Sequence, residues 1–141
     1  MKNLNIRLMT AEDYPSVFDL WAATEGMALR NYDDSFEGIA KFLRKNPTSN
    51  FVAELDGVII GTLLCGMDGR RAYLYHTVVR ADLRNRGVGK RLLAEAYKAI
   101  EAEGIRKSGL LVMADNGQGQ AFWASQGWDK REDVIYYSKN N

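Results

Sequence analysis

A short basic segment with two closely spaced glycines is the part of the sequence best suited to do chemistry. It reads Arg84-Asn85-Arg86-Gly87-Val88-Gly89-Lys90 and lies between a stretch rich in β-branched residues and a long amphipathic stretch. Glycines lack a Cβ, so backbone N–H groups can approach a ligand closely, and the N–H groups at a helix start favour an anion. The segment therefore predicts a site for a phosphate-bearing ligand. A glycine-containing turn with a solvated basic face is the alternative.

Two other phosphate-binding motifs do not fit the same residues. A Walker A loop has four residues between its glycines and a Ser or Thr after its lysine. Here the glycines are two positions apart and Arg91 follows Lys90. A dinucleotide-binding fingerprint needs a third glycine where Leu92 stands. Both motifs are therefore excluded.

The pattern of apolar residues places the basic segment between a strand and a helix, in the element order βααβββαβαβ. Alternation and apolar runs predict strands over residues 5–9, 51–55, 58–67, 72–79, 108–113 and 134–138. Helical spacing predicts helices over residues 35–44, 88–104 and 116–126, and an earlier one after a Thr10–Asp13 capping box. Antiparallel strands come first and a βαβ unit follows. This order predicts one α/β domain over residues 1–141, with a mixed sheet covered by helices.

Composition and charge exclude several classes of protein. The 141 residues include 19 Lys and Arg against 18 Asp and Glu, which is too balanced for a nucleic-acid binder with a cationic surface. No apolar run approaches the ~20 residues that span a bilayer, and residues 1–7 lack the apolar core of a secretion signal. One Cys and one His cannot build a thiolate or multi-histidine metal centre. We therefore expect a cytoplasmic protein with no metal, no membrane contact and no nucleic-acid partner.

Two motifs carry a resemblance to a known family. The first is Arg84-Asn85-Arg86-Gly87-Val88-Gly89, which fits the pattern Arg/Gln-x-x-Gly-x-Gly/Ala between a strand and a long helix. The second combines Asn116 with Phe122-Trp123 and Gly127-Trp128, and is similar to a block of the form Asn…Tyr…Gly-Phe. With the order of elements, these motifs resemble the GCN5-related N-acetyltransferases, the GNAT family.

The resemblance implies a fold and a cosubstrate, acetyl-CoA. The implied fold is α/β, with a mixed, mostly antiparallel sheet of six to seven strands flanked by four helices. Its central strands, here 72–79 and 108–113, splay apart to admit the pantetheine arm. The Val79 N–H would bind the thioester carbonyl, as an oxyanion hole does. Asn116 would hydrogen-bond the arm, cap its helix, or do both.

The cofactor site implied by the resemblance consists mainly of main-chain groups. Those at the end of strand 72–79 would pair with pantetheine, and those of the basic segment would hold the pyrophosphate. The implied residues are Thr77, Val78, Val79, Arg84, Asn85, Arg86, Gly87, Val88, Gly89, Lys90, Asn116 and Trp123.

The implied reaction is direct attack by a primary amine on the thioester within a ternary complex. The acceptor is a small molecule or a protein N-terminus. Trp123 stands where the family usually has a tyrosine that acts as general acid, and an indole N–H cannot serve as an acid near neutral pH. A non-catalytic module that binds or senses acyl-CoA is therefore the alternative function.

Strand parity selects the candidate bases. Tyr73 and Tyr75 share one face of strand 72–79, the face on which family members place a base or a water-holding group, so we predict them as catalytic residues. Cross-strand aromatic packing is the alternative role of both tyrosines. Parity predicts that His76 points to the opposite face, into packing. Glu25, Asp33 and Asp34 in the loop 25–36 would suit a cationic amine, and a merely solvated acidic loop is the alternative. The edge of the last strand could pair with a second copy to form a homodimer.

Overall fold

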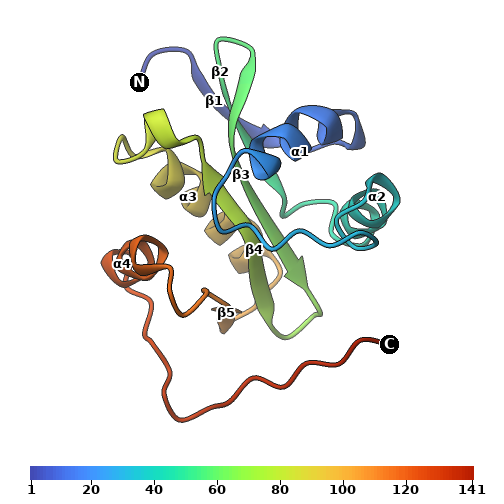
Figure 1. The fold of residues 1–141 in the computed structure, drawn as a ribbon, viewed down its shortest axis with the longest axis vertical. Coiled ribbons are helices and arrows are strands. Elements are labelled where there is room, and N and C mark those ends of the chain that lie inside the picture. Colours follow the sequence, from blue (N-terminus) through green and yellow to red (C-terminus); the bar gives the residue numbers. More distant parts are fainter. The chain divides into compact units, whose positions relative to one another are not determined.

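Five strands in the order β1-β2-β3-β4-β5 form one sheet (Figure 1). The computed structural model describes residues 1–141 and divides them into two units, Met1–Leu111 and Val112–Asn141. The first unit contains β1 (Leu4–Leu8), α1 (Tyr14–Ala22), α2 (Phe36–Lys45), β2 (Phe51–Leu55), β3 (Val58–Met67), β4 (Ala72–Val79), α3 (Val88–Ala102) and β5 (Ser108–Leu110). The second unit contains α4 (Gly117–Ser125).

The sheet is antiparallel from β1 to β4, and β5 joins β4 in parallel. Asp56 and Gly57, which connect β2 to β3, have φ values of 51° and 81°. Positive φ at both positions is what a two-residue hairpin turn of type I′ requires. The predicted antiparallel strands followed by a βαβ unit are therefore confirmed, and α3 makes the crossover.

Helices α1 and α2 cover one face of the sheet and α3 covers the other (Figure 1). On the first face, Val17 and Trp21 of α1 and Ile39 of α2 pack against Leu64 and Val78, all of them buried. The helix α3 turns an apolar side to the second face, because its buried residues recur at helical spacing. The predicted α/β class with four helices is confirmed.

The predicted number of strands, six to seven, is wrong, because the sheet has five. The apolar run 134–138 forms no strand, and its side chains at Ile135 and Tyr137 are 82% and 88% exposed. A β-favouring composition becomes a strand only where a neighbouring strand pairs with its N–H and C=O groups. The strand β5 is also shorter than predicted, since it ends at Leu110 instead of residue 113.

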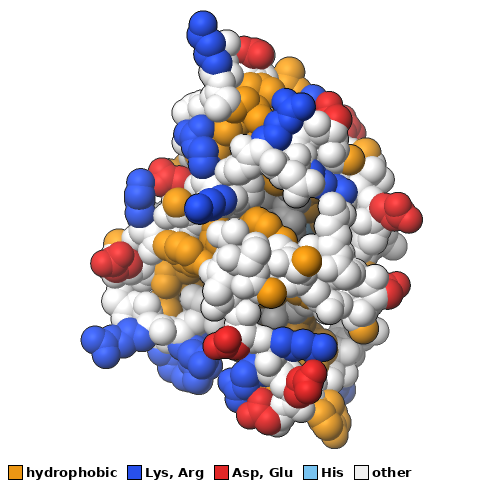
Figure 2. All heavy atoms as spheres, turned by 90° about the vertical axis from the view of Figure 1, so that its left-hand side faces the viewer, with side chains coloured by type: hydrophobic (Ala, Val, Ile, Leu, Met, Phe, Trp, Pro, Cys, Tyr) orange, Lys and Arg blue, Asp and Glu red, His pale blue; other side chains and the backbone are white.

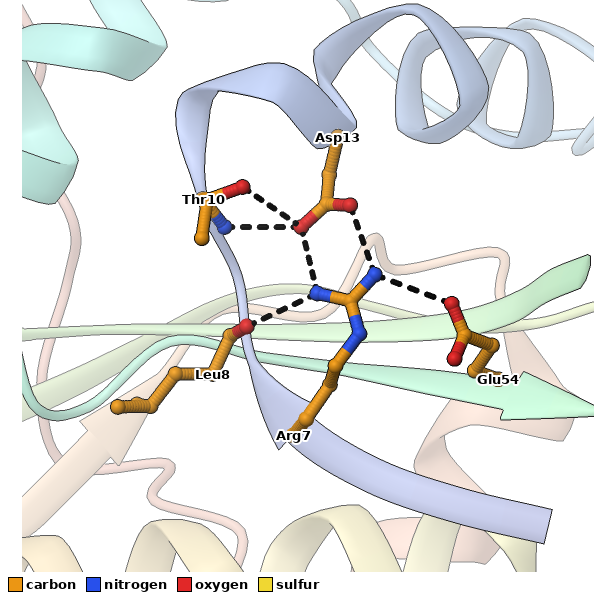
Figure 3. Close-up of polar contacts among 5 residues, drawn as sticks. All are labelled: Arg7, Leu8, Thr10, Asp13 and Glu54. Atoms are coloured by element: carbon orange, nitrogen blue, oxygen red, sulfur yellow. Dashed lines mark hydrogen bonds and ion pairs between the residues drawn. The ribbon is translucent and has the colours of Figure 1, made fainter. Parts of the chain in front are cut away.

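Arg7 joins β1, β2 and the start of α1 through one guanidinium group (Figure 3). It donates to both carboxylate oxygens of Asp13, at 2.9 and 2.8 Å, and to Glu54 Oε2 at 3.1 Å. Asp13 also accepts from the Thr10 N–H at 2.8 Å, which completes the predicted capping box. Burial raises the pKa of Asp13, but the hydrogen bonds from Arg7 and Thr10 outweigh burial and hold that pKa below its ordinary value.

We expect Arg7→Met to lower the free energy of unfolding by about 1.5–3 kcal/mol, the usual range for hydrogen bonds to charged groups. The pKa of Asp13 is lower in the folded protein than its unfolded-state value of about 3.9. The stabilisation that this difference provides is complete above the unfolded-state pKa and is lost as the pH falls through the folded-state pKa. The variant should therefore lose less of its stability than the wild type between neutral pH and about pH 3. Urea denaturation at both pH values measures this.

Arg131→Met is the matched control, because Arg131 forms an equally bidentate ion pair with Asp133 at 2.7 and 2.8 Å. Both of its side chains are more than half exposed, so its loss should cost about 0–1 kcal/mol. Equal costs for the two variants would contradict a structural role specific to Arg7.

Candidate active site

The end of β4 extends beyond the strand that pairs with it. β4 and β5 are paired only at Ala72, Tyr73 and Leu74, opposite residues 108–110. From Tyr75 to Val79, β4 continues with only β3 as its neighbour in the sheet. This is the pairing expected of two central strands that part, and it leaves main-chain groups of β4 without a β5 partner.

A β-bulge lies in this part of β4. Tyr75 is opposite Leu64 and Val78 is opposite Thr62, so His76 and Thr77 share the space of one residue on β3. The His76 φ of 42° lies in the left-handed region, which is uncommon for a residue other than glycine. Bulges of this kind redirect side chains and are frequent beside active sites.

The bulge overturns the prediction that His76 points away from the face of Tyr75. The His76 ring lies edge-on to Trp21 of α1, with ring centroids 4.6 Å apart, and the Tyr75 ring lies edge-on to Phe42 of α2 at 5.9 Å. Both side chains therefore lie on the face that α1 and α2 cover. The prediction was wrong because the extra residue of a bulge interrupts the two-residue alternation of a strand.

Asp34, in the loop before α2, is the polar partner of His76. Its Oδ1 lies 2.6 Å from His76 Nε2, its Oδ2 accepts from the Arg30 N–H at 2.8 Å, and its side chain is only 8% exposed. The Tyr14 hydroxyl donates to the Asp34 carbonyl at 2.7 Å. Burial, together with the charges of Asp34 and Glu37, raises the pKa of Tyr14. These contacts hold the Asp34 loop against both α1 and β4.

Gly38 allows the first turn of α2 to pack directly on this loop. A Cβ built at Gly38 would lie 2.4 Å from the Tyr32 carbonyl oxygen and 2.6 Å from that of Asp33. Ser35 caps the helix, because its Oγ accepts from the Gly38 N–H at 3.1 Å. This role of Gly38 was not predicted from the sequence. Its signal, a glycine in the first turn after an N-cap serine, is common to many helices.

Two hollows open near these residues. One, of about 240 Å³, is lined by Leu20, Ala23, Thr24, Glu25, Arg80, Ala81 and Arg84. The other, of about 230 Å³, is lined by Tyr14, Phe18, Leu29, Arg30, Asn31, Asp34 and Ser35. Two of the three acidic residues that the sequence suggested for an amine, Glu25 and Asp34, therefore lie on the walls of hollows. The third, Asp33, is exposed.

The start of α3 has unpaired donors and no side-chain cap. The N-cap is Gly87, with φ 85°, and the first hydrogen bond of the helix runs from the Arg91 N–H to the Gly87 carbonyl at 3.1 Å. The N–H groups of residues 88–90 consequently have no acceptor within the helix. A Cβ at Gly87 would meet no atom within 4 Å, so the space in front of this turn is open. The geometry suits an anion.

Arginine side chains tie the loop between β4 and α3 to its surroundings. Arg84 Nε donates to the Val79 carbonyl at 3.0 Å, and Arg80 Nε pairs with Asp82 Oδ1 at 2.7 Å. Arg86 and Lys90 are exposed. On the face drawn in Figure 2, Lys and Arg side chains alternate with Asp and Glu and form no single continuous patch. Arg86 and Lys90 supply exposed positive charge at this loop that could attract an anion.

Thr77 has a buried hydroxyl without a partner. Its Oγ1 is shielded from solvent and makes no hydrogen bond within the chain. Such an unpaired buried group is costly unless a ligand or water satisfies it. Thr77 is one of the residues for which the sequence predicted contact with pantetheine, and its position in the bulge marks the same stretch of β4.

The second unit holds the two remaining cofactor-site residues. Asn116 is the N-cap of α4, and its Oδ1 accepts from the Gly119 N–H at 2.9 Å. Trp123 packs edge-on against Phe122 and Trp128, with ring centroids 5.0 and 5.2 Å apart. The capping role of Asn116 is confirmed, whereas contact of Asn116 and Trp123 with CoA stays a prediction.

The remaining thiol and metal-ligating side chains form no further reactive site. Cys65 is fully buried, and burial raises the pKa of its thiol to about 11, so the thiol stays protonated near neutral pH. His, Cys, Asp and Glu side chains form no group of three or more that could hold a metal ion. No helix has both the length and the apolar surface needed to cross a membrane.

Comparison with known proteins places the chain in a family. The model of the acetyltransferase (GNAT) family matches residues 11–128. An acetyltransferase of Sodalis glossinidius is 28% identical over 136 residues, which is 96% of this chain and 94% of that protein. An acetyltransferase of Pectobacterium atrosepticum is 33% identical over 113 residues, 80% and 79% of the two chains. The chain belongs to the acetyltransferase (GNAT) family.

A solved structure shows the same fold. The PaiA N-acetyltransferase of Thermoplasma acidophilum, determined in complex with coenzyme A, is 22% identical, has a TM-score of 0.81 and covers 94% of this chain and 92% of its own. The predictions of family and fold type are therefore confirmed, as is the prediction that the chain is an acyltransferase enzyme.

Proposed function

We propose that this enzyme transfers the acetyl group of acetyl-CoA to a primary amine by direct attack within a ternary complex. The observation that carries the proposal is the uncapped start of α3, where the N–H groups of residues 88–90 are open beside the end of β4. Free donors at a helix start, the open space at Gly87 and the unpaired Thr77 hydroxyl fit a phosphate-bearing ligand with a polar arm. When bound, acetyl-CoA supplies the acetyl thioester.

The residues of the cofactor site would act in three groups. The N–H groups of residues 84–90 bind the diphosphate, with the helix dipole of α3 adding to their attraction for negative charge. Main-chain groups of residues 77–79 bind the pantetheine arm, and the Val79 N–H stabilises negative charge on the thioester oxygen. Contact of Asn116 and Trp123 with CoA is the third part of the proposal.

Proton transfer requires a base for the amine and an acid for the sulfur. Tyr75 and Tyr73 are candidates to hold a water that carries the proton of the amine away from the site, since both side chains are nearly half exposed. The contact of Tyr75 with Phe42 equally suits the packing role that the sequence left open. Because the indole N–H of Trp123 releases no proton near neutral pH, we expect water to supply the proton that the product thiol needs.

The acceptor that we propose is a small molecule with a primary amine. An aminoglycoside acetyltransferase from an uncultured soil sample, determined in complex with sisomicin, has the same fold, with a TM-score of 0.77 at 20% identity over 99% of this chain and 97% of its own. The hollows of about 240 and 230 Å³ would hold part of such a molecule. A protein N-terminus is the second class of acceptor to test.

Calorimetry with CoA and a thiol-release assay with acetyl-CoA test the proposal together. The assay should cover kanamycin, spermidine, tyramine and a peptide with a free N-terminal alanine. We expect saturable binding of CoA and release of thiol with at least one amine. The absence of CoA binding would contradict the proposal. If the protein bound CoA but released no thiol with any amine, and Trp123→Tyr behaved in the same way, the result would instead favour a module that senses acyl-CoA.

A further inference from the structure

We propose that His76, held by Asp34, is the group that takes the proton from the acceptor amine; this inference rests on the proposed function. His76 is the single histidine of the chain. It lies three residues before Val79 on β4, within the part of the strand that β5 does not pair. The base is therefore on the same strand as the main-chain groups proposed to hold the thioester.

The hydrogen bond to Asp34 fixes how the imidazole can act. Asp34 Oδ1 lies 2.6 Å from His76 Nε2 and, as an ionised carboxylate, can only accept, so Nε2 carries the hydrogen. The second ring nitrogen, Nδ1, then keeps its lone pair for a proton. The His76 side chain is 22% exposed whereas that of Asp34 is 8% exposed, so only the imidazole of the pair has appreciable access to a ligand.

Three separate contacts restrain His76, more than packing alone requires. Besides Asp34, the ring of Trp21 lies edge-on to the imidazole at 4.6 Å, with an angle of 86° between the rings. The Thr62 hydroxyl donates to the His76 carbonyl at 2.8 Å and accepts from Trp21 Nε1 at 3.0 Å. The restrained backbone has a left-handed φ of 42°. Strain that several contacts maintain is found preferentially at functional sites.

Charged and titratable groups near the His76–Asp34 pair belong to α1, to β4 and to the loop before α2. Asp34 belongs to the loop before α2, and the Arg30 N–H binds its second oxygen. Tyr14 of α1 donates to the Asp34 carbonyl, and Tyr75 precedes His76 on β4. Asp34 is the only one of these groups whose charge contacts the imidazole directly. The Asp34 carboxylate therefore orients the imidazole through its Nε2 atom.

The proposed reaction involves two proton transfers, one from the amine and one to the sulfur. An amine enters as an ammonium ion and gives one proton to His76 Nδ1, which passes it to solvent. The nitrogen lone pair then forms the carbon–nitrogen bond while the carbon–sulfur bond breaks and its electron pair goes to sulfur. A second proton of the nitrogen reaches the sulfur through water. The products are an amide, a thiol and one proton in solvent, so atoms and charge balance.

The variant His76→Gln tests the proposal, because its side-chain amide can still donate to Asp34 but cannot take a proton near neutral pH. We expect kcat/KM for the best amine of the panel to fall by about 10²–10⁴-fold, the usual contribution of a general base, with the affinity for CoA unchanged in calorimetry. The acid limb of the pH profile of kcat/KM should disappear. Added imidazole should restore part of the activity of His76→Ala.

Asp34 is a positioning residue, and its test has a readout that needs no turnover. In the free protein, the Nε2 proton of the one histidine should give an NMR signal that is protected from exchange with water. Asp34→Asn should remove that protection and shift the acid limb of the pH profile. Asp19→Asn, the same change of charge at an exposed site on α1, should do neither.

The outcomes separate this inference from the function on which it rests. If kcat/KM of His76→Gln stayed within about twofold of the wild-type value and its pH profile kept the acid limb, the role of His76 would be overturned. The proposed acetyltransferase function would still stand. An unprotected Nε2 proton in the wild type would overturn the pairing with Asp34. A wild type that neither binds CoA nor releases thiol with any amine of the panel would overturn both proposals.

Discussion

Gly87→Val is expected to weaken CoA binding by at least about 100-fold. The backbone of Gly87 has φ 85°, which a β-branched residue avoids, so the valine should force the turn out of its present shape. Reorienting two of the N–H groups at residues 88–90 would remove two hydrogen bonds to a charged ligand, each contributing about 1.5–3 kcal/mol. Calorimetric titration with CoA measures the affinity.

Gly57→Val is the matched control for this substitution. Gly57 has nearly the same φ, 81°, and a Cβ there also meets no atom within 4 Å, but it lies in the hairpin between β2 and β3. Both variants should lose stability through the same backbone strain, and only Gly87→Val should lose affinity for CoA. Equal affinities of the two folded variants would show that the start of α3 does not bind the coenzyme.

Thr62→Val is expected to lower the free energy of unfolding by about 2–6 kcal/mol. The fully buried Thr62 hydroxyl satisfies two groups, the Trp21 indole N–H at 3.0 Å and the His76 carbonyl at 2.8 Å. Valine has nearly the same shape but leaves both groups unpaired, and each unsatisfied buried group costs about 1–3 kcal/mol. Urea denaturation measures the loss. The histidine NMR signals should also change, since the bulge at His76 loses its anchor.

Thr62→Ser keeps the hydroxyl and removes one methyl group, so its expected cost is only about 1 kcal/mol. If the serine and valine variants were equally unstable, the loss would come from packing and not from the hydrogen bonds. Such a result would also remove one of the three restraints on which the role of His76 depends.

Several elements could be predicted closely because their signals are local. The bounds of β2, β3 and β4 agree with the prediction, since apolar runs and an Asp-Gly turn mark them in the sequence. The start of α3 at Val88 followed from Gly87 and Gly89 at the beginning of a helical apolar period. The same glycines located the proposed anion site, because main-chain donors at a helix start depend on the local conformation alone.

The pairing of His76 with Asp34 lies beyond such signals. The two residues are 42 positions apart, and nothing local links them. The bulge that turns His76 toward Trp21 is invisible in the alternation of β4, since β-branched and aromatic residues continue on both sides of it. At residues 134–138 the error is the opposite, because a composition that favours a strand predicted one where the chain forms none.

From its sequence alone, this protein could be assigned to its family and its α/β class, and the helix start proposed as an anion site could be located, because residue period, turn chemistry and glycine spacing act over a few neighbouring residues. Only the tertiary structure decided which side chains surround the end of β4. Packing of α1 and α2 against the bulge brings Trp21, Asp34 and His76 together. Contacts between distant segments form only when the whole chain has folded, and so the proton-accepting pair belongs to the fold and not to any single motif.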